Sequence, residues 1–345
     1  MPTDRIAIVG ATGFTGSELV RLLHHHPTAE ITLITSESRS GQRLADVHPF
    51  LDGVTDRVLG SLDDLSTADI DLAFLAVPHG VAMDVVKRLD ETRLPVVDLS
   101  ADYRLNDAAS FEAWYGQEHR FPEAMKHAVY GLPELFRSEI PGRRLVANPG
   151  CYPTSILLAL APLVRAGAVN TTDLIADSKS GVTGAGARSK PVNHFSTVND
   201  DFAAYGLKTH RHTIEVQQHL GALTDAEVTV QFTPHLLPVD RGILSTIYAR
   251  PRGEMDQERL DEIFRTAYAD EPFVRLRDRP PRIKDVRGTN LCDLHATWDE
   301  RTGRILVLSA IDNLVKGAAG QAIQNMNLIL GHDEGLGLDL VPLRP

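Results

Sequence analysis

One stretch decides the fold: Arg5-Ile-Ala-Ile-Val-Gly10-Ala-Thr-Gly13-Phe-Thr-Gly16-Ser-Glu-Leu-Val-Arg-Leu-Leu23. Its apolar start is typical of a strand buried on both faces, and its end has the apolar periodicity of a helix. Between them, three glycines follow the spacing G-x-x-G-x-x-G. A strand, a glycine-rich turn and a helix are typical of a dinucleotide-binding unit, since glycines let the main chain approach a pyrophosphate. An ordinary tight turn has the same pattern. The predicted cofactor contacts are Gly10, Thr12, Gly13, Phe14, Thr15 and Gly16.

The segment after the second predicted strand, Glu30–Thr35, indicates which dinucleotide is used. Enzymes that use NAD tend to carry an acidic residue there, which binds the ribose hydroxyls. Here the segment reads Ser36-Glu-Ser-Arg-Ser-Gly41. Ser38 and Arg39 suit a 2′-phosphate, whereas Glu37 favours NAD. We expect NADP as the cofactor, with NADPH as its reduced form, and Ser38 and Arg39 as contacts.

Strands and helices alternate along the chain to about residue 150. Asp69–Pro78 and Pro95–Ser100 have the pattern of buried strands, and Gly80–Leu89 that of a helix. This alternation predicts an α/β domain with a Rossmann-type, doubly wound parallel sheet. Because ligands bind beyond the carboxyl ends of such strands, we expect Pro78 near the cofactor. Residues 106–143 are expected to be irregular, with a turn at Tyr130–Glu134.

The second half of the chain has period-two patterns and predicts a different domain. Strands are expected at Asp173–Ser178, Glu227–Leu237, Gly242–Ala249, Leu291–Asp299 and Arg304–Ile311, with a helix at Asp256–Asp270. We expect an α+β domain with a mixed or antiparallel sheet over residues 151–312. The first domain should span residues 1–150, and a last helix, 313–331, should pack back on it. Asn313 either caps that helix or contacts the nicotinamide amide.

The first candidate for chemistry lies in Leu145-Val-Ala-Asn-Pro-Gly-Cys-Tyr-Pro-Thr154. An apolar run ends at the turn Asn148–Gly150, and Pro153 and Thr154 open a helix. Cys151 therefore lies at a helix N-terminus, where the helix dipole favours the thiolate, the nucleophilic form. The alternative is that Cys151 is a small buried hydrophobic residue, as free cysteines usually are.

A second candidate is the glycine-rich stretch Lys179-Ser-Gly-Val-Thr-Gly-Ala-Gly-Ala-Arg188. We expect it to form a flexible loop that follows a strand. Successive main-chain N–H groups in such a loop can bind an anion, so Ser180 and Gly181 are expected to seat phosphate or cofactor. The alternative is a mobile surface loop, and the role of Arg188 stays open.

A third candidate is Tyr205-Gly-Leu-Lys-Thr-His210-Arg-His212-Thr-Ile-Glu215, which leads into a predicted helix, Glu215–Leu220. Basic residues at a helix N-terminus oppose the dipole, so local stability does not explain them. Histidine titrates near neutral pH and is a natural proton donor, although a lone histidine is more often structural. We expect a functional role for at least one of His210 and His212. The segment lacks the ligand spacing of a metal site, and no metal is expected.

A fourth candidate is Ser100-Ala-Asp-Tyr-Arg-Leu105, which follows a predicted strand. The planar guanidinium of Arg104 suits a carboxylate or a phosphate, so Arg104 is a candidate for binding an anionic substrate. The alternative is a surface ion pair between Asp102 and Arg104.

The composition limits the classes of protein to which the chain can belong. The chain has 345 residues, 43% hydrophobic and 23% charged, with a formal net charge of -11. That charge argues against nucleic acid or an anionic membrane as a partner, and no apolar run is long enough to span a bilayer. Two isolated cysteines suggest a reducing cytosol, and we see no signal peptide. His24–His26 is expected to be the solvated end of the first helix.

With these motifs assembled, the chain resembles the N-acetyl-γ-glutamyl-phosphate reductase family of the semialdehyde dehydrogenase superfamily, over nearly its whole length. The motifs that carry the resemblance are Gly10–Gly16, Ser100–Leu105, Asn148–Thr154, Lys179–Gly186, His210–His212, Pro234–Gly242 and Asp312–Gln321. The cysteine motif and the His-Arg-His segment are specific, whereas the glycine motif is common to many dinucleotide folds. The chain departs from the family pattern at Ser155, where Gly or Ala is usual, at Ile214, where proline is usual, and at Ala187.

The resemblance implies NADPH-dependent reduction of an acyl phosphate, N-acetyl-glutamyl 5-phosphate, to N-acetyl-glutamate 5-semialdehyde in cytoplasmic arginine biosynthesis. It implies a thioester on Cys151, a proton from His212 or His210, and a homodimer or homotetramer built through the second domain. The implied substrate contacts are Arg104, Asn148, Ser180 and Arg211. The alternatives are an aspartate-semialdehyde dehydrogenase, a lysine-pathway aminoadipyl-phosphate reductase and, outside the enzymes, an NADP-binding sensor.

Overall fold

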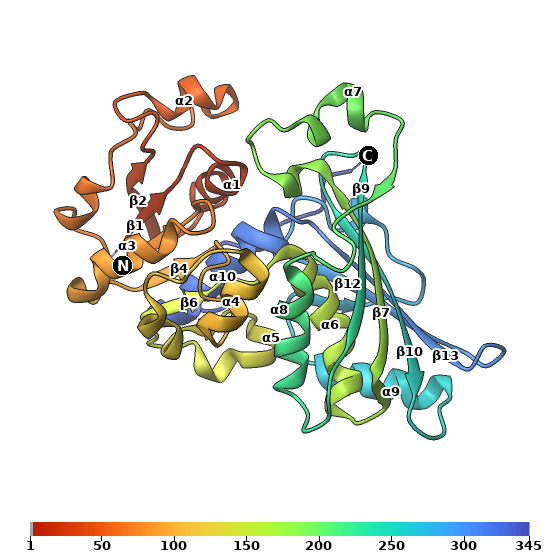
Figure 1. Cartoon of the computed structure of the whole chain (residues 1–345). Coiled ribbons are helices and arrows are strands. Elements are labelled where there is room, and N and C mark those ends of the chain that lie inside the picture. Colours follow the sequence, from red (N-terminus) through yellow and green to blue (C-terminus); the bar gives the residue numbers. More distant parts are fainter. Residues whose placement is uncertain (1–2, 345) are drawn as a thin grey trace. The chain divides into compact units, whose positions relative to one another are not determined.

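The chain folds into two units, shown in Figure 1 as a computed structural model that describes residues 3–344. The first unit contains residues 3–149 and 318–339, and the second contains residues 150–317 and 340–344. The chain therefore leaves the first unit just before Cys151 and returns to it just after Gly317.

The first unit is built on a six-stranded parallel sheet with the order β2-β1-β3-β4-β6-β5. The strands are β1 (Asp4–Val9), β2 (Ala29–Thr35), β3 (Leu72–Leu75), β4 (Val96–Asp98), β5 (Val129–Tyr130) and β6 (Leu145–Ala147). β1 pairs with β2 on one side and with β3 on the other, so the strand order reverses at β1. The predicted doubly wound parallel sheet is confirmed, and the glycine-rich turn follows the strand at which the order reverses.

Helices of the first unit connect these strands and include the last helix of the chain. They are α1 (Phe14–Leu23), α2 (Leu44–Val47), α3 (Ala82–Leu89), α4 (Ala108–Tyr115), α5 (Pro133–Phe136) and α10 (Gly320–Leu330). α10 contacts α1 and β4, and it follows a π-helical turn, η9 (Val315–Ala319). The first unit also contains the short 3₁₀ turns η1 (Pro49–Leu51), η2 (Asp63–Ser66), η3 (Asp90–Thr92), η4 (Pro122–Lys126) and η5 (Arg137–Glu139). The 3₁₀ turns of the second unit are η6 (Val182–Ala185), η7 (Pro191–Asn193) and η8 (Ile283–Asp285).

The turn between β1 and α1 requires glycine at two positions. Gly10 has a φ of +90°, and a Cβ there would lie 2.4 Å from the Ala76 carbonyl oxygen. A Cβ on Gly16 would lie 2.4 Å from the Gly10 carbonyl oxygen. At Gly13 the nearest atom would be 3.7 Å away, which is ordinary contact. The first glycine of the motif is therefore required by the close approach of the main chain after β3, and the third by main-chain packing within the turn.

Two predictions for the first unit are wrong in part. Residues 106–143 contain the helix α4, capped by the Asp107 carboxylate, and the edge strand β5. The sequence pattern does not reveal α4, because Phe111 is its one buried residue and no apolar repeat marks the helix. His26 is buried, not solvated, and its Nε2 lies 3.1 Å from Asn327 Oδ1 of α10.

The second unit is built on a seven-stranded mixed sheet with the order β11-β12-β13-β10-β7-β9-β8. Its strands are β7 (Val169–Gly181), β8 (Ala203–Ala204), β9 (Val230–Leu237), β10 (Ile243–Pro251), β11 (Val274–Leu276), β12 (Cys292–Asp299) and β13 (Arg304–Ile311). The pairs β7–β9 and β11–β12 are parallel, and the others are antiparallel. The predicted mixed sheet is confirmed.

Helices cover one face of this second sheet. They are α6 (Cys151–Arg165), which packs on β7, β10 and β13, α8 (His212–Gly221), which packs on β9, and α9 (Gln257–Tyr268), which packs on β11 and β12. The short helix α7 (Phe195–Val198) lies in the connection between β7 and β8 and contacts η7. Buried residues alternate along these three strands on the α6 side. On the opposite side, Ile175, Tyr248 and Leu306 form one cross-strand row and remain partly exposed. This row is apolar and less deeply buried than the α6 side, whereas the neighbouring row on the same side contains Asp177 and Thr246. No helix among residues 3–344 is long and apolar enough to cross a membrane.

The substitution Gly16→Ala is expected to destabilise the protein by about 3 kcal/mol, because the added Cβ displaces the main chain of residues 10 and 11. Gly13→Ala is the matched control, and the expected change is within about 1 kcal/mol. Urea unfolding followed by circular dichroism measures both. Equal losses for the two variants would contradict this account of the turn.

Candidate active site

Cys151 is the first residue of α6, as its sequence context predicts. β6 ends at Ala147, the turn Asn148–Gly150 follows, and Gly150 is the residue that caps the helix. Cys151 is partly exposed, whereas the following residues of α6, 152–164, are buried. The Thr154 N–H donates a hydrogen bond to the Gly150 carbonyl oxygen at 2.9 Å, which closes the first turn of the helix. A thiolate at this position interacts favourably with the positive end of the helix dipole.

Gly317 lies against Cys151. A Cβ built on Gly317 would lie 2.8 Å from the Cys151 Cβ, so no larger residue fits without displacing the cysteine. Gly317 belongs to the π-helical turn η9, and its N–H donates to the Asp312 carbonyl oxygen at 2.9 Å. π-Helical turns often occur at functional sites. The approach of this main chain to the cysteine depends on a glycine 166 residues further along the chain.

Glu215 is a site residue that local sequence patterns do not reveal. Its side chain is fully buried, and its Oε1 accepts a hydrogen bond from the Gly150 N–H at 2.8 Å. Glu215 lies in the first turn of α8, three residues after His212. The start of α8 is therefore hydrogen-bonded to the residue that caps the cysteine helix. A buried carboxylate bonded to main-chain N–H groups compensates the positive ends of helix dipoles.

His210 and His212 take different places at the start of α8. His212 is the first residue of the helix, and its N–H donates to His210 Nδ1 at 3.2 Å. The two ring centroids are 4.8 Å apart. Burial, assisted by the Arg211 charge, lowers the pKa of His210 to about 4. His210 is thus a neutral imidazole that accepts from the main chain, and it orients the residue that carries the second imidazole.

Tyr152 joins the cysteine helix to both histidines. Its ring contacts the rings of His210, His212 and Phe232 edge-on, at centroid distances of 5.6, 5.9 and 5.2 Å. Its hydroxyl donates to the His235 carbonyl oxygen at 3.2 Å and accepts from the Tyr205 hydroxyl at 3.1 Å. Burial raises the pKa of Tyr152. The residue after Cys151 therefore holds the two imidazoles in one aromatic cluster.

The glycine-rich stretch after β7 is more ordered than its composition predicts. Lys179, Ser180 and Gly181 belong to β7, which is paired on both sides through Ser180, so the expectation of a flexible loop is wrong for these residues. Ser180 is buried, and its hydroxyl donates to the Gly181 carbonyl oxygen at 3.0 Å. It lies close enough to the Tyr152 hydroxyl to offset part of the rise in the pKa of Tyr152 that burial causes. Ser180 and Cys151 thus share a neighbour. Arg188 lies exposed beyond the 3₁₀ turn η6.

Asn313 does not cap the last helix. The last helix, α10, begins at Gly320 and not at 313 as expected, and its N-cap is Ala319, without a side-chain cap. Asp312 precedes the π-helical turn η9, and its Oδ1 accepts from the N–H groups of Leu314 and Val315 at 2.9 and 3.2 Å. Asn313 instead bridges two segments: its Nδ2 donates to Thr183 Oγ1 at 3.0 Å, and its Oδ1 accepts from the Gly242 N–H at 2.7 Å. The amide holds the end of the glycine-rich stretch against the start of β10.

Arg104 lies in the first unit, beyond the carboxyl ends of β4 and β6. It is 6% exposed, and its Nε and Nη2 donate to the carbonyl oxygens of Asn148 and Leu99 at 2.8 and 2.9 Å. Asp102 is fully buried and accepts from the N–H groups of Gly80 and Met83. A surface ion pair between Asp102 and Arg104 is therefore excluded by the burial of both side chains.

Two further polar groups organise this part of the first unit. Burial, together with the nearby Asp102 carboxylate, raises the pKa of Asp98 to about 7. Ser100 donates its hydroxyl and its N–H to Asp98 at 2.8 Å. The Asn148 amide is held at both ends, because Nδ2 donates to the Ala318 carbonyl oxygen and Oδ1 accepts from Asn325 Nδ2, both at 3.1 Å.

The residues expected from the sequence to contact the 2′-phosphate follow β2. Ser38 and Arg39 are exposed, and Arg39 Nη1 donates to Gln42 Oε1 at 3.4 Å. The Glu37 carboxylate accepts from the Leu62 N–H at 2.9 Å. A residue that the motif does not predict, His48, reaches the glycine-rich turn, with its Nε2 3.1 Å from the Thr12 carbonyl oxygen. Pro78 follows β3 and precedes Gly80, which has a φ of +87°.

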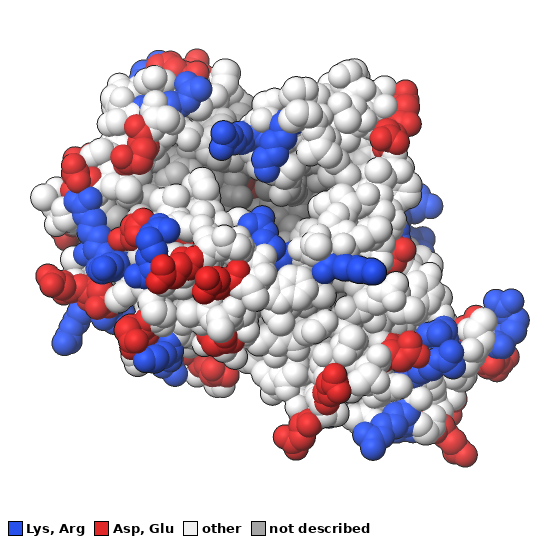
Figure 2. All heavy atoms as spheres, viewed as in Figure 1, with Lys and Arg blue, Asp and Glu red and all other residues white. Residues whose placement is uncertain are grey.

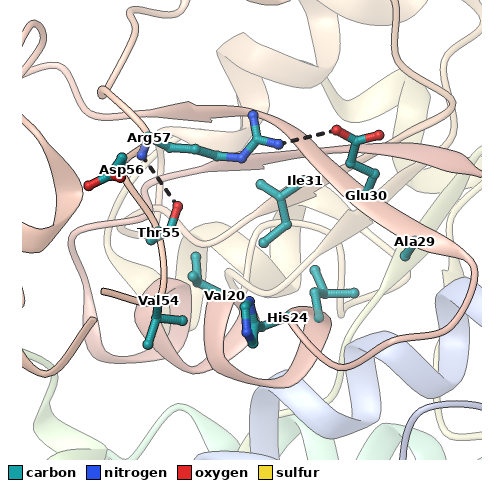
Figure 3. Close-up of a pocket in the computed structure, with 10 residues that line it drawn as sticks. Val20, His24, Ala29, Glu30, Ile31, Val54, Thr55, Asp56 and Arg57 are labelled. Carbon is teal, nitrogen blue, oxygen red and sulfur yellow. Dashed lines mark hydrogen bonds and ion pairs between the residues drawn. The ribbon is translucent and has the colours of Figure 1, made fainter. Parts of the chain in front are cut away.

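A cavity of about 480 Å³ in the first unit lies elsewhere (Figure 3). Its walls are the carboxyl end of α1, the first residues of β2 and the segment 54–57, and Arg57 approaches Glu30 beside it. Ligands of parallel sheets bind beyond the carboxyl ends of the strands, whereas this cavity lies at the amino end of β2. Acidic and basic side chains are interspersed over the face shown in Figure 2. Neither observation marks a second centre that competes with Cys151.

Comparison with known proteins gives concordant results. The NAD-binding domain model of the semialdehyde dehydrogenases matches residues 5–142, and the semialdehyde dehydrogenase dimerisation domain model matches residues 151–313. The chain is 51% identical to an N-acetyl-gamma-glutamyl-phosphate reductase from Geotalea daltonii, over 99% of both chains. It is also 51% identical to one from Desulfotalea psychrophila, again over 99% of both.

Solved structures show the same fold at low sequence identity. The aspartate semialdehyde dehydrogenase II from Vibrio cholerae is similar with a TM-score of 0.74 and 16% identity, over 96% of this chain and 99% of that one. An aspartate semialdehyde dehydrogenase with NADP from Candida albicans has a TM-score of 0.70 and 18% identity, over 94% and 98%.

The burial of His210 makes stability depend on pH. Because its folded-state pKa of about 4 lies below that of an unfolded histidine, stability is full above pH 6.5 and falls as the pH drops from 6.5 to 4, by up to about 3 kcal/mol. In His210→Asn an acceptor is kept and the titration is removed, so this loss should shrink. Urea unfolding at pH 7.0, 5.5 and 4.5 measures it. Parallel pH profiles for the variant and the wild type would refute the assignment.

Proposed function

The chain belongs to the N-acetyl-γ-glutamyl-phosphate reductase family of the semialdehyde dehydrogenases, and we propose that it reduces N-acetyl-glutamyl 5-phosphate to N-acetyl-glutamate 5-semialdehyde and phosphate in arginine biosynthesis. One observation of the structure carries this proposal beyond similarity. A partly exposed cysteine begins α6, and the ring of the next residue, Tyr152, contacts two imidazoles at the start of α8. That is the arrangement that acyl transfer through a thioester needs.

The first half of the reaction uses the Cys151 thiolate. Its sulfur attacks the acyl carbon of the substrate, the S–C bond forms, and the C–O bond to phosphate breaks. Phosphate leaves with the bonding electrons, and the acyl group remains on Cys151 as a thioester. The helix dipole of α6 favours the thiolate before attack.

The second half needs a hydride and a proton. A bound NADPH supplies the hydride that reduces the thioester carbonyl. His212, as an imidazolium, gives its proton to the oxygen of the tetrahedral adduct. When the adduct collapses to the aldehyde, the electrons of the S–C bond return to the Cys151 sulfur and the proton returns to His212. His210 suits this step poorly, because it is neutral near pH 7 and its Nδ1 accepts from the His212 N–H.

Substrate recognition is assigned to four polar side chains. Arg104 is proposed to bind the substrate carboxylate, and its two bonds to main-chain carbonyls support this role because they fix the plane of the guanidinium. The other proposed contacts are Asn148, Ser180 and Arg211. Asn148 and Ser180 are buried and hydrogen-bonded, so their orientations are set before substrate binds.

The nicotinamide cofactor is supported by the NAD-binding domain model, and we propose NADP as its form. The turn from Gly10 to Gly16 has the close main-chain packing that a pyrophosphate site needs. Ser38 and Arg39 are proposed to hold the 2′-phosphate. Glu37 is a weaker argument for NAD than its position in the sequence indicates, because its carboxylate already accepts a hydrogen bond from the Leu62 N–H. The remaining proposed contacts are Thr12, Phe14, Thr15, Pro78, Gly181 and Asn313.

The dimerisation domain model supports self-association, and we propose a homodimer or homotetramer. The open side of the second sheet supports the choice of surface, because the row of Ile175, Tyr248 and Leu306 carries apolar side chains that lie opposite α6 and stay partly exposed. A cytoplasmic location is proposed as well. Both cysteines, Cys151 and Cys292, are free thiols, which fits a reducing compartment.

The substitution Cys151→Ser is expected to lower the reductase rate more than about a thousandfold and to leave NADP binding intact, since the hydroxyl is a far weaker nucleophile. The assay runs in reverse, with NADP, phosphate and either N-acetyl-glutamate semialdehyde or aspartate semialdehyde. The acetylated substrate should be preferred. Cys292→Ala, at the other, fully buried cysteine, should keep its activity. Near wild-type turnover by Cys151→Ser would rule out the covalent route, and NADP binding without turnover by the wild type would favour a sensor.

The substitution Arg39→Ala is expected to raise the KM for NADPH about tenfold and to leave the KM for NADH unchanged, because only NADPH has the 2′-phosphate. Arg43→Ala is the matched control: Arg43 is an exposed arginine on the same segment, paired with Asp46, Asp52 and Asp56. Steady-state kinetics with both cofactors measure the effect. An equal change for NADPH and NADH would refute the assignment.

A further inference from the structure

A row of serines crosses the face of the second sheet that α6 covers. Ser178 of β7, Ser245 of β10 and Ser309 of β13 are directly opposite one another in the register of adjacent strands. All three are fully buried, and Ser178 Oγ lies 2.7 Å from Ser245 Oγ. The next row along the strands is apolar and consists of Ala176, Ile247 and Val307. A polar row in this position interrupts an otherwise apolar contact between helix and sheet.

Ser155 connects α6 to this row. Its side chain is fully buried, and its Oγ is hydrogen-bonded to Ser245 Oγ and to Ser309 Oγ, both at 2.9 Å. A hydroxyl can donate one hydrogen bond and accept two, so the three groups satisfy one another. Ser155 is thereby tied to two adjacent strands at once. This fixes both the position of the helix along the strands and its rotation about its own axis.

Apolar packing alone does not explain these hydroxyls. Alanine at the four positions would fill nearly the same volume, and a serine hydroxyl that loses its partner in the interior costs about 1–3 kcal/mol. Hydrogen-bonded polar networks in a core select one arrangement, because any shift of the helix leaves several groups unsatisfied together.

Ser155 lies one helical turn after Cys151. Residues four apart in a helix lie on the same face, separated by about 6 Å along the axis. From the serine row, one step of two residues along β7 leads from Ser178 to Ser180, which lies beside Tyr152. At the same end, the Asp312 carbonyl oxygen, just past β13, accepts from the Gly317 N–H beside Cys151. A rotation of α6 at Ser155 would therefore move the Cys151 sulfur relative to both groups.

We propose that Ser155 is a positioning residue: its hydrogen bonds to Ser245 and Ser309 set the rotation of α6 and thereby aim the Cys151 thiolate. This inference rests on the role proposed above for Cys151. Glu215 already holds the start of α6 through its hydrogen bond with Gly150. Ser155 would hold the same helix one turn later.

The test compares Ser155→Ala with Ser178→Ala in the full-length protein. Both variants remove one fully buried hydroxyl of the same network, and only Ser155 belongs to α6. The readouts are Tm, kcat and KM for the acyl phosphate, and the pH at which iodoacetamide alkylates Cys151 half-maximally. Alkylation is followed by mass spectrometry of the Cys151 peptide, so it needs no turnover and does not report on Cys292.

Both variants are expected to lose Tm to a similar extent. Ser155→Ala alone should lower kcat about tenfold with KM unchanged within about twofold, and should raise the alkylation midpoint by about half a pH unit. Ser245→Ala removes the partner of Ser155 on the strand, so it should also lower kcat and raise the alkylation midpoint. This variant serves as the test if Ser155→Ala does not fold. Wild-type kcat and midpoint in Ser155→Ala, or equal shifts in Ser178→Ala, would overturn the proposal. An inactive wild type with the expected alkylation shifts would refute the proposed function and not the positioning.

Discussion

The hydrogen bond from the Gly150 N–H to the buried carboxylate of Glu215 is the contact on which the site depends. It joins the starts of two helices, α6 and α8, whose dipoles both present positive ends. Bringing two such ends together, with a histidine on one of them, is unfavourable unless a negative charge lies nearby. Glu215 supplies that charge from inside the protein, where solvent cannot screen it. The carboxylate allows a cysteine and an imidazole to begin neighbouring helices, so one buried group serves both the packing and the chemistry.

The rest of the second unit holds this junction in place. Tyr152 places an aromatic ring against both histidines, and the His210 ring accepts the N–H of His212. Gly317 brings the main chain of η9 onto Cys151, where any side chain would displace it. The serine row beneath Ser155 ties the same helix to the centre of the sheet. The cysteine is thus constrained from its cap, from its neighbour in sequence, from the following helical turn and from a distant turn of the chain.

Local patterns in the sequence predict the elements well and the contacts between them poorly. The turn at Gly10–Gly16 and the helix at Cys151 were predictable because glycine and proline act on their immediate neighbours. Glu215 and Gly317 were not, since each meets the Cys151 region across more than 60 residues of chain. α4 was missed because it buries only Phe111, and His26 was misplaced because its partner, Asn327, lies near the other end of the chain. For Asn313 the sequence left open a helix cap or a contact with the nicotinamide. The cap was wrong, because the Asn313 amide binds Thr183 and Gly242, which lie far away in the chain.

The central claim is that Cys151 is held as a nucleophile that takes the acyl group from the substrate. The most direct measurement is mass spectrometry of the intact protein and of its Cys151 peptide after incubation with N-acetyl-glutamyl 5-phosphate and no NADPH. The account predicts one added N-acetyl-glutamyl group per chain, located on Cys151, released by hydroxylamine, and accompanied by one equivalent of phosphate. An unmodified Cys151 peptide, with the acyl phosphate still consumed when NADPH is added, would contradict it.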